Sequence, residues 1–211
     1  MRERLLKEAA QELGVRADSI DFDGTKFVSG DREITLDDLA TGRLYNNDTR
    51  QIAVTESFHG HVSPPPFMAA FGEFEFDTET YEYKMVKYVT VTDCGTTINP
   101  MLAKGQVEGG IIQGYGMASS EEVLYTPKGK LISCTFDTYH VPTVKEVGEL
   151  VTEFADSYEP TGPFGAKSVG EIGIDTPPAV LCNAVYNAFG VRVHSLPITP
   201  QKIFEAMKAK K

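Results

Sequence analysis

Residues 162–171 read Gly-Pro-Phe-Gly-Ala-Lys-Ser-Val-Gly-Glu, which is three glycines, two further small residues, one lysine and a closing carboxylate. Small side chains let a backbone approach a ligand closely, and successive exposed N–H groups can form an anion-binding concavity. A carboxylate at the end of such a loop stands where a general base would be useful. The stretch therefore predicts a ligand-binding loop with Glu171 as the candidate base. A glycine-rich surface turn with a solvated glutamate is the commoner use of this composition.

A second glycine-rich segment, residues 105–116 (GQVEGGIIQGYG), lies inside a helix predicted from about Met101 to Ser119. Each glycine inside a helix costs about 0.5–1 kcal/mol relative to alanine, so five of them require a reason. Either the helix packs closely against another backbone, or a large ligand approaches it. The amide of Gln106 offers both a donor and an acceptor, which suits the edge of a heterocycle.

A third segment, residues 93–100 (DCGTTINP), separates a predicted strand from this helix. Small polar residues at a strand-to-helix junction can bind a ligand at the helix N-terminus. An ordinary turn that is capped by Asp93 or Asn99 explains the pattern equally well.

The pattern of apolar residues predicts an α+β fold, with mixed sheets and helices packed on them. Alternation predicts a hairpin around residues 77–80, with strands on both sides. The other predicted strands are 20–22, 26–28, 131–136, 150–154 and 191–194. Four further helices are predicted. The first ends at Leu13, the second follows a Thr35/Asp38 capping box and ends at Leu39, the third begins at Thr176 and ends at Phe189, and the last follows Thr199 near the C-terminus. Residues 41–66 lack periodicity and read as a long connection.

The bulk composition is that of an acidic globular protein. The 211 residues include 30 acidic and 20 basic side chains, for a net charge of −10. This balance argues against nucleic acid or an anionic membrane as the main partner, because both require a basic surface. No apolar run reaches the roughly 18 residues of a membrane span, and no signal-peptide pattern is present, so we expect a cytoplasmic location.

No ligand set for a protein-bound metal is apparent. Cys94, Cys134 and Cys182 are widely spaced and form no C-x-x-C pair, which excludes a zinc ribbon or an iron–sulfur cluster and predicts free thiols. His59 and His61 could bind a metal, but nothing near them completes a ligand set, and a loop pair without metal is the commoner case.

Taken together, the segments 93–100, 105–116 and 162–171 resemble, in this order, the C-terminal part of the molybdenum-binding subunit of the xanthine dehydrogenase and aldehyde oxidase family. The resemblance covers most of the chain. It implies a molybdopterin-binding region over residues 1–211, with a helix and hairpin segment at 1–66 and a cofactor-binding segment at 67–211.

The resemblance implies a molybdenum hydroxylase, which oxidises a heterocycle or an aldehyde at an electron-poor carbon with water as the oxygen source. Glu171 matches the general base of that family, and Gln106 matches a glutamine that hydrogen-bonds the pterin. The backbone of Gly165, Ala166, Lys167, Ser168, Val169 and Gly170 would line the metal–pterin end. Ser168 departs from the pattern, since many relatives have glycine there.

The resemblance also implies cofactors and partners. The cofactor would be molybdenum–molybdopterin, in the cytosine dinucleotide form. The upstream glycine- and phenylalanine-rich motif of the family is not in this sequence, so we expect the remaining part of the molybdenum subunit on a partner, together with iron–sulfur and FAD subunits. The alternative is a non-catalytic fragment or assembly module that binds no cofactor.

Overall fold

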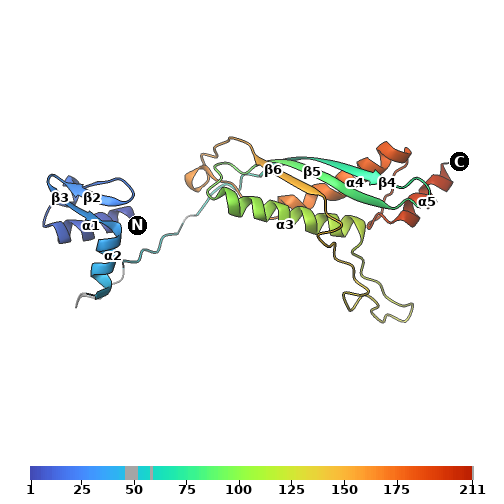
Figure 1. Ribbon diagram of the computed structural model, residues 1–211, viewed down its shortest axis with the longest axis horizontal. Coiled ribbons are helices and arrows are strands. Elements are labelled where there is room, and N and C mark those ends of the chain that lie inside the picture. The colour runs from blue at the N-terminus through green and yellow to red at the C-terminus, as the bar shows by residue number, and fades with distance from the viewer. Residues whose placement is uncertain (46–51, 58, 211) are drawn as a thin grey trace. The chain divides into compact units, whose positions relative to one another are not determined.

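The computed structural model describes residues 1–45, 52–57 and 59–210, and these form two compact units, Met1–His59 and Gly60–Lys211 (Figure 1). Each unit has its own sheet and its own hydrophobic core. The change from one unit to the other falls inside the predicted connection 41–66, although a helix occupies the first residues of that connection. Residues 46–51 and 58, also part of it, lie outside the described residues.

The first unit is a small three-stranded antiparallel sheet with two helices. Its elements are α1 (Arg2–Leu13), the short 3₁₀ turn η1 (Ala17–Ser19), β1 (Asp21–Phe22), β2 (Lys26–Ser29), β3 (Arg32–Thr35) and α2 (Leu36–Tyr45). The predicted hairpin is confirmed, and Asp23 closes its turn by accepting the backbone N–H groups of Thr25 and Lys26. Asp38 N donates to Thr35 Oγ1 at 3.0 Å, as the capping pattern predicts, but α2 is longer than expected.

The second unit is built on a three-stranded mixed sheet in the order β4 (Phe67–Phe76), β5 (Tyr83–Asp93) and β6 (Glu149–Phe154). The pair β4–β5 is antiparallel, as the hairpin pattern predicts, and β6 adds to β5 in parallel. Alternate residues of β4 are exposed, so one face of the sheet is open and the other is packed. The packed face meets α3 (Pro100–Ser119) through Met85, Tyr88, Val107 and Ile111.

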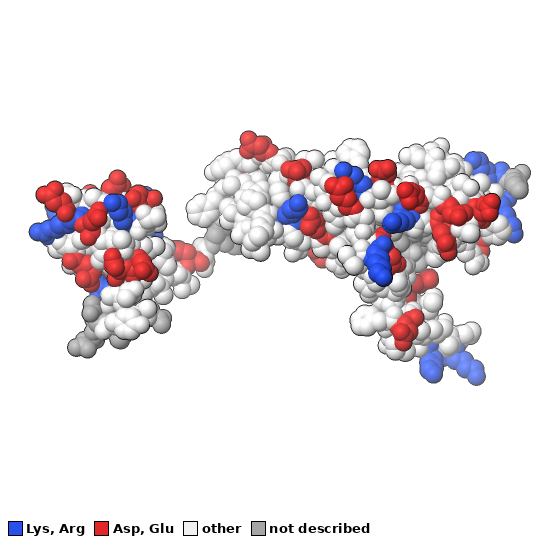
Figure 2. All heavy atoms as spheres, in the orientation of Figure 1, with Lys and Arg blue, Asp and Glu red and all other residues white. Residues whose placement is uncertain are grey.

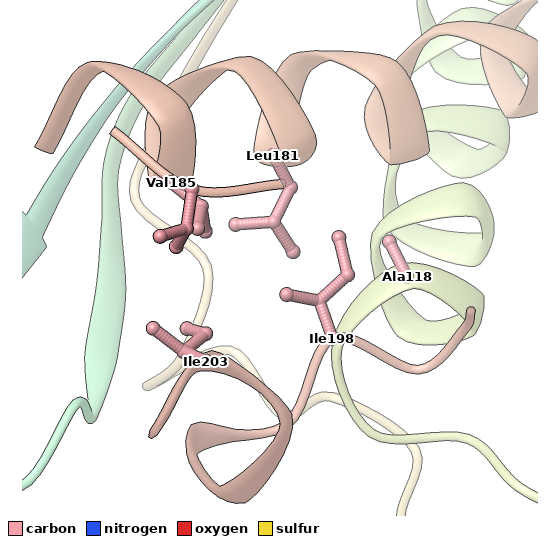
Figure 3. Close-up of a cluster of buried hydrophobic side chains, with 6 residues drawn as sticks. Ala118, Leu181, Val185, Ile198 and Ile203 are labelled. Carbon is pink, nitrogen blue, oxygen red and sulfur yellow. The ribbon is translucent and has the colours of Figure 1, made fainter. Parts of the chain in front are cut away.

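The remaining helices close the core of this unit. Leu181 and Val185 of α4 (Ile172–Phe189) pack with Ile198 and with Ile203 of α5 (Pro200–Ala209), and Ala118 at the end of α3 completes the cluster (Figure 3). A 3₁₀ turn, η2 (Pro163–Gly165), lies in the glycine-rich loop. The predicted α+β architecture is therefore confirmed.

Helices α3 and α4 approach each other through glycines. A Cβ atom on Gly110 would lie 3.1 Å from the Cα of Gly173, and one on Gly114 would lie 2.5 Å from the carbonyl oxygen of Ile174. The cost of glycine in a helix is thus offset at these positions by backbone-to-backbone packing. At Gly105 and Gly109 a Cβ would meet nothing within 4 Å, so packing inside the unit does not require glycine there.

Three predicted elements are wrong. Helix α4 begins at Ile172, not at Thr176, and carries Pro177 and Pro178 in its interior. Thr176 does not cap the helix; its hydroxyl accepts a hydrogen bond from Tyr88 at 3.0 Å. Residues 131–136 and 191–194 form no strands, because neither segment runs beside another strand in the described structure; only an isolated bridge joins Tyr125 to Leu131.

Candidate functional site

The glycine-rich loop is fastened to the strand-to-helix junction 93–100 by backbone hydrogen bonds. Lys167 N donates to the carbonyl of Cys94, and Thr96 N donates to the carbonyl of Gly165, each at 2.7 Å. Gly95 has φ +65°, and a Cβ on it would lie 2.2 Å from Gly165 O. Glycine is therefore required at position 95, both by its left-handed backbone and by the close approach of the two segments.

A charged contact fixes the same two segments through side chains. Lys167 Nζ donates to Asp93 Oδ2 at 2.6 Å, and the Lys167 side chain is only 7% exposed. The other carboxylate oxygen of Asp93 accepts from Ser157 Oγ at 2.5 Å and from Gly95 N at 3.1 Å. The hydrogen bond from Lys167, followed by those from Ser157 and Gly95, lowers the pKa of Asp93 to about 2, so this carboxylate is ionised at neutral pH.

Helix α3 reaches the end of the loop through one side chain. Gln106 Nε2 donates to the carbonyl of Gly170 at 2.6 Å. This bond places the amide of Gln106 beside the residue that precedes Glu171. Within the described residues Gln106 Oε1 receives no hydrogen bond, so it can accept one from a ligand.

Glu171 is the N-cap residue of α4 and its side chain is exposed. In the described part of the chain its carboxylate makes no hydrogen bond and no ion pair. The backbone N–H groups of Ser168, Val169 and Glu171 likewise find no acceptor in the described residues. A carboxylate that can take up a proton therefore adjoins three N–H groups that can bind an anionic or carbonyl ligand.

A hollow of about 250 Å³ lies between the loop, the junction and the start of α3. Residues of all three segments line it, among them Cys94, Asn99, Leu102, Ala166, Lys167 and Val169. Asn99 Oδ1 caps α3 by accepting from Leu102 N at 3.1 Å, so the helix N-terminus forms one wall of the hollow.

The structure divides the predicted site residues into two groups. Gly165, Ala166 and Lys167 direct their polar groups into the protein, where they hold the loop in place. Gln106, Ser168, Val169, Gly170 and Glu171 lie together at the accessible end of the loop.

Sequence reasoning did not find Ser157 as an anchor of Asp93, and an isolated serine in a loop gives no pattern by which it could be found. Asp93 itself was singled out as a turn cap, and it does bond to Gly95 N, yet its main partner is Lys167.

The described residues contain no group of three or more His, Cys, Asp or Glu side chains arranged to hold a metal ion. Cys94 is buried, Cys134 is exposed and Cys182 is half-buried, and all three are free thiols, as the spacing predicts. No helix in the described part of the chain is both long enough and apolar enough to cross a membrane.

The glycine-rich loop is thus fastened to a strand-to-helix junction, beside a helix that presents a glutamine. Residues 1–148 match the family model of the molybdopterin cofactor-binding domain, and the chain belongs to this family. The family resemblance found in the sequence is thereby confirmed.

The individual relatives are oxidoreductases by name. The chain is 32% identical over 210 residues to the gamma subunit of the 6-hydroxypseudooxynicotine dehydrogenase complex of Paenarthrobacter nicotinovorans, covering 95% of this chain and 26% of that protein. It is 29% identical over 213 residues to a probable hypoxanthine oxidase of Escherichia coli strain K12, covering 99% of this chain and 22% of the relative.

Among solved structures, quinoline 2-oxidoreductase from Pseudomonas putida 86 matches with a TM-score of 0.74 at 25% identity, over 98% of this chain and 28% of that one. The chain thus spans about a quarter of the length of the proteins that it matches.

Proposed function

We propose that this chain supplies the general base and part of the cofactor cradle of a molybdenum hydroxylase, which oxidises a heterocycle or an aldehyde at an electron-poor carbon with water as the oxygen source. The observation that carries the proposal is the exposed carboxylate of Glu171, free of protein partners in the described structure, directly after a loop with unpaired N–H groups. The relatives support this class of reaction, because their names describe dehydrogenases, oxidases and oxidoreductases of small molecules.

The residues present fit a molybdopterin cofactor. The unpaired N–H groups of Ser168, Val169 and Glu171 are donors, and Gln106 Oε1 is an acceptor, which together match the mixed donor and acceptor edges of a pterin. When bound, the cofactor supplies a metal centre that accepts the electrons of the oxidation. We propose the cytosine dinucleotide form of it, with iron–sulfur and FAD groups on partner subunits; the cytoplasmic location stays a prediction of the sequence.

The role of each residue follows from its position. Glu171 takes up a proton at its carboxylate while the oxygen nucleophile attacks the substrate carbon. Gln106 positions Gly170, and with it Glu171, through its hydrogen bond from α3. Asp93 and Lys167 keep the backbone of the loop fixed, so that the N–H groups at 168, 169 and 171 stay oriented toward the ligand.

The test is Glu171→Gln in the complex assembled in the native host. We expect the molybdenum content per chain, measured by elemental mass spectrometry, to stay near that of the unmodified complex while turnover falls at least ~100-fold, as loss of a general base predicts. Asp175→Asn is the matched control, because Asp175 is also an exposed carboxylate in the first turn of α4.

Near-normal turnover with Glu171→Gln would remove this residue from the mechanism. A complex recovered without molybdenum, even from the unmodified chain, would instead favour the non-catalytic assembly module.

A further inference from the structure

The longest irregular segment of the Gly60–Lys211 unit, residues 121–146, extends between the end of α3 and the start of β6. In Figure 1 this segment projects away from the sheet and the helices of its own unit. We refer to residues 121–146 as the arm. None of its residues is buried, and none belongs to a core cluster of the unit.

The arm nevertheless has a defined backbone. Thr126 N donates to Lys130 O, and Ile132 N donates to Leu124 O, each at 2.8 Å, so the outer part is a short hairpin. Ser133 Oγ links the two sides by accepting from Leu124 N and donating to Glu122 O, each at 2.8 Å. Backbone and serine hydrogen bonds therefore join the two sides of the outer arm, with no hydrophobic core beneath it.

Polar contacts close the base of the arm, and one of them joins it to Ser120, the residue that follows α3. Tyr139 OH donates to Glu121 Oε2 at 2.5 Å, and Ser120 Oγ donates to the carbonyl of His140 at 3.0 Å. His140 Nε2 lies 2.7 Å from Glu146 Oε1, and Glu146 also accepts from Thr143. The base is thus fixed, and the outer part extends from it.

Large apolar side chains are exposed along the arm. Figure 2 shows uncharged side chains over much of the arm, acidic side chains part-way along it and basic side chains near its end. The exposed large hydrophobic residues of the arm are Val123, Leu124, Tyr125, Leu131, Ile132, Phe136, Val141 and Val144. Phe136 is 85% exposed and Val144 is 89% exposed, so neither contributes to the folding of the unit through burial.

An isolated hairpin is marginally stable in water, and a contiguous exposed apolar patch marks an interaction site. We infer that the arm is a docking element that binds the polypeptide carrying the remaining three quarters of the length of the relatives. On this inference, which rests on the proposed function, the arm is the surface through which the chain binds its partner.

Two observations favour that partner. The family model matches residues 1–148, a range that includes the whole arm. In the relatives the same domain lies in a polypeptide about four times as long, since it makes up 26% and 22% of them. In these two relatives the rest of the same polypeptide accompanies the domain, and for this reason we choose it as the partner of the arm.

The experiment captures complexes from the native host through a tag on the full chain and identifies the captured polypeptide by mass spectrometry. The test variant is Phe136→Ser with Val144→Ser. We expect at least ~10-fold less of the partner to be recovered, as the loss of an apolar anchor at an interface predicts. The matched control is Phe71→Ser with Val62→Ser, because these side chains are 69% and 59% exposed outside the arm.

Hydrogen exchange on the unmodified complex provides a second measurement. The amides of residues 121–146 should exchange more slowly in the complex than in the isolated chain. Unchanged exchange there, or full recovery of the partner with the arm variant, overturns the inference. So does a chain recovered alone, or one that binds only a second copy of itself.

The variant Glu171→Gln separates this inference from the proposed function. It should retain the partner whether or not Glu171 is the base. Retained assembly with unaffected turnover would refute the catalytic proposal alone, whereas an arm variant that still binds the partner would refute the docking surface alone.

Discussion

Lys167 Nζ lies 2.6 Å from Asp93 Oδ2, although 74 residues separate the two along the chain. Asp93 ends β5 and Lys167 lies in the glycine-rich loop, so this contact joins the sheet to the segment that carries Glu171. Lys167 is also positioned over the ring of Phe67, with 5.0 Å from Nζ to the ring centroid. Lys167 therefore anchors the loop to β5, and the backbone N–H groups of residues 168, 169 and 171 are available to a ligand.

Replacing Lys167 with methionine should destabilise the Gly60–Lys211 unit. The change removes a charge-assisted hydrogen bond from a nearly buried side chain and leaves Asp93 with two weaker partners, so we expect a loss of about 1.5–3 kcal/mol in the free energy of unfolding. Urea denaturation checks it. Lys104→Met is the control, because it removes only a surface ion pair within α3, with 3.7 Å between Lys104 Nζ and Glu108 Oε1. Its free energy of unfolding should fall by no more than about 0.5 kcal/mol. Equal losses in both variants would contradict the anchoring role.

The same contact predicts a pH dependence. The pKa of Asp93 falls from 3.8 to about 2 on folding, so its contribution to stability is present in full above about pH 4 and is lost as the pH falls toward 2. Folding also lowers the pKa values of other carboxylates, such as Asp77 and Glu159, so their contributions to stability are lost over the same acidic range. The effect of Asp93 must therefore be isolated by comparing the unmodified chain with an Asp93 variant. The difference in unfolding free energy between the unmodified chain and Asp93→Asn should be constant from pH 5 to 7 and should shrink below pH 4. A difference that stays constant down to pH 2 would rule out this ionised pair.

The glycines of α3 should divide into two kinds. Gly114→Ala places a methyl group 2.5 Å from Ile174 O and should destabilise the unit by about 1–3 kcal/mol through overpacking. Gly109→Ala meets nothing within 4 Å and should stabilise the isolated chain by roughly 0.5–1 kcal/mol, because alanine is the better helix former. Thermal denaturation of the two variants measures this. If both variants changed the melting temperature in the same direction, contact between α3 and α4 would not be the reason for glycine at these two positions.

Gln106→Ala should weaken cofactor retention more than it weakens folding. The variant loses the hydrogen bond to Gly170 O and the Oε1 acceptor, and we expect roughly tenfold weaker retention of molybdenum, the size of effect seen when a supporting contact at a metal site is removed. The melting temperature of the assembled complex should change little, because Gln106 is exposed. Gln113→Ala, seven residues along the same helix, is the control. Unchanged molybdenum occupancy in Gln106→Ala would oppose its assignment to the cofactor.

Much of the fold follows from local patterns. The hairpin β4–β5 and the helix α3 were predicted from alternation and from the Asn99-Pro100 start, because each of these signals acts within a few residues. The start of α4 was placed wrongly at Thr176-Pro177 for the same reason. Proline favours the first helical turn, yet here the helix continues back to Ile172, where Gly173 packs against the backbone of α3. That contact is made across the fold, so the local sequence gives no sign of it.

The candidate site was predicted in outline. The loop and Glu171 were found because glycines and a closing carboxylate form a pattern within ten residues. The partner of Lys167 could not be found, since a single aspartate at a strand end is indistinguishable from a turn cap until β5 and the loop are brought together. Residues 131–136 were wrongly predicted to form a strand because they include several apolar side chains, which are typical of a buried strand. In the structure these side chains, such as Ile132, are exposed.

Helix α3 borders the site loop near its first turns and leads directly into the arm at its end. It has 20 residues, and at ~1.5 Å of rise per residue its axis measures ~30 Å. The length of α3 therefore sets the separation between the loop that carries Glu171, where we propose catalysis, and the arm, where we propose binding to the partner. A partner that contacts both places must therefore extend over a comparable distance, and a fully extended peptide would need at least about nine residues to do so.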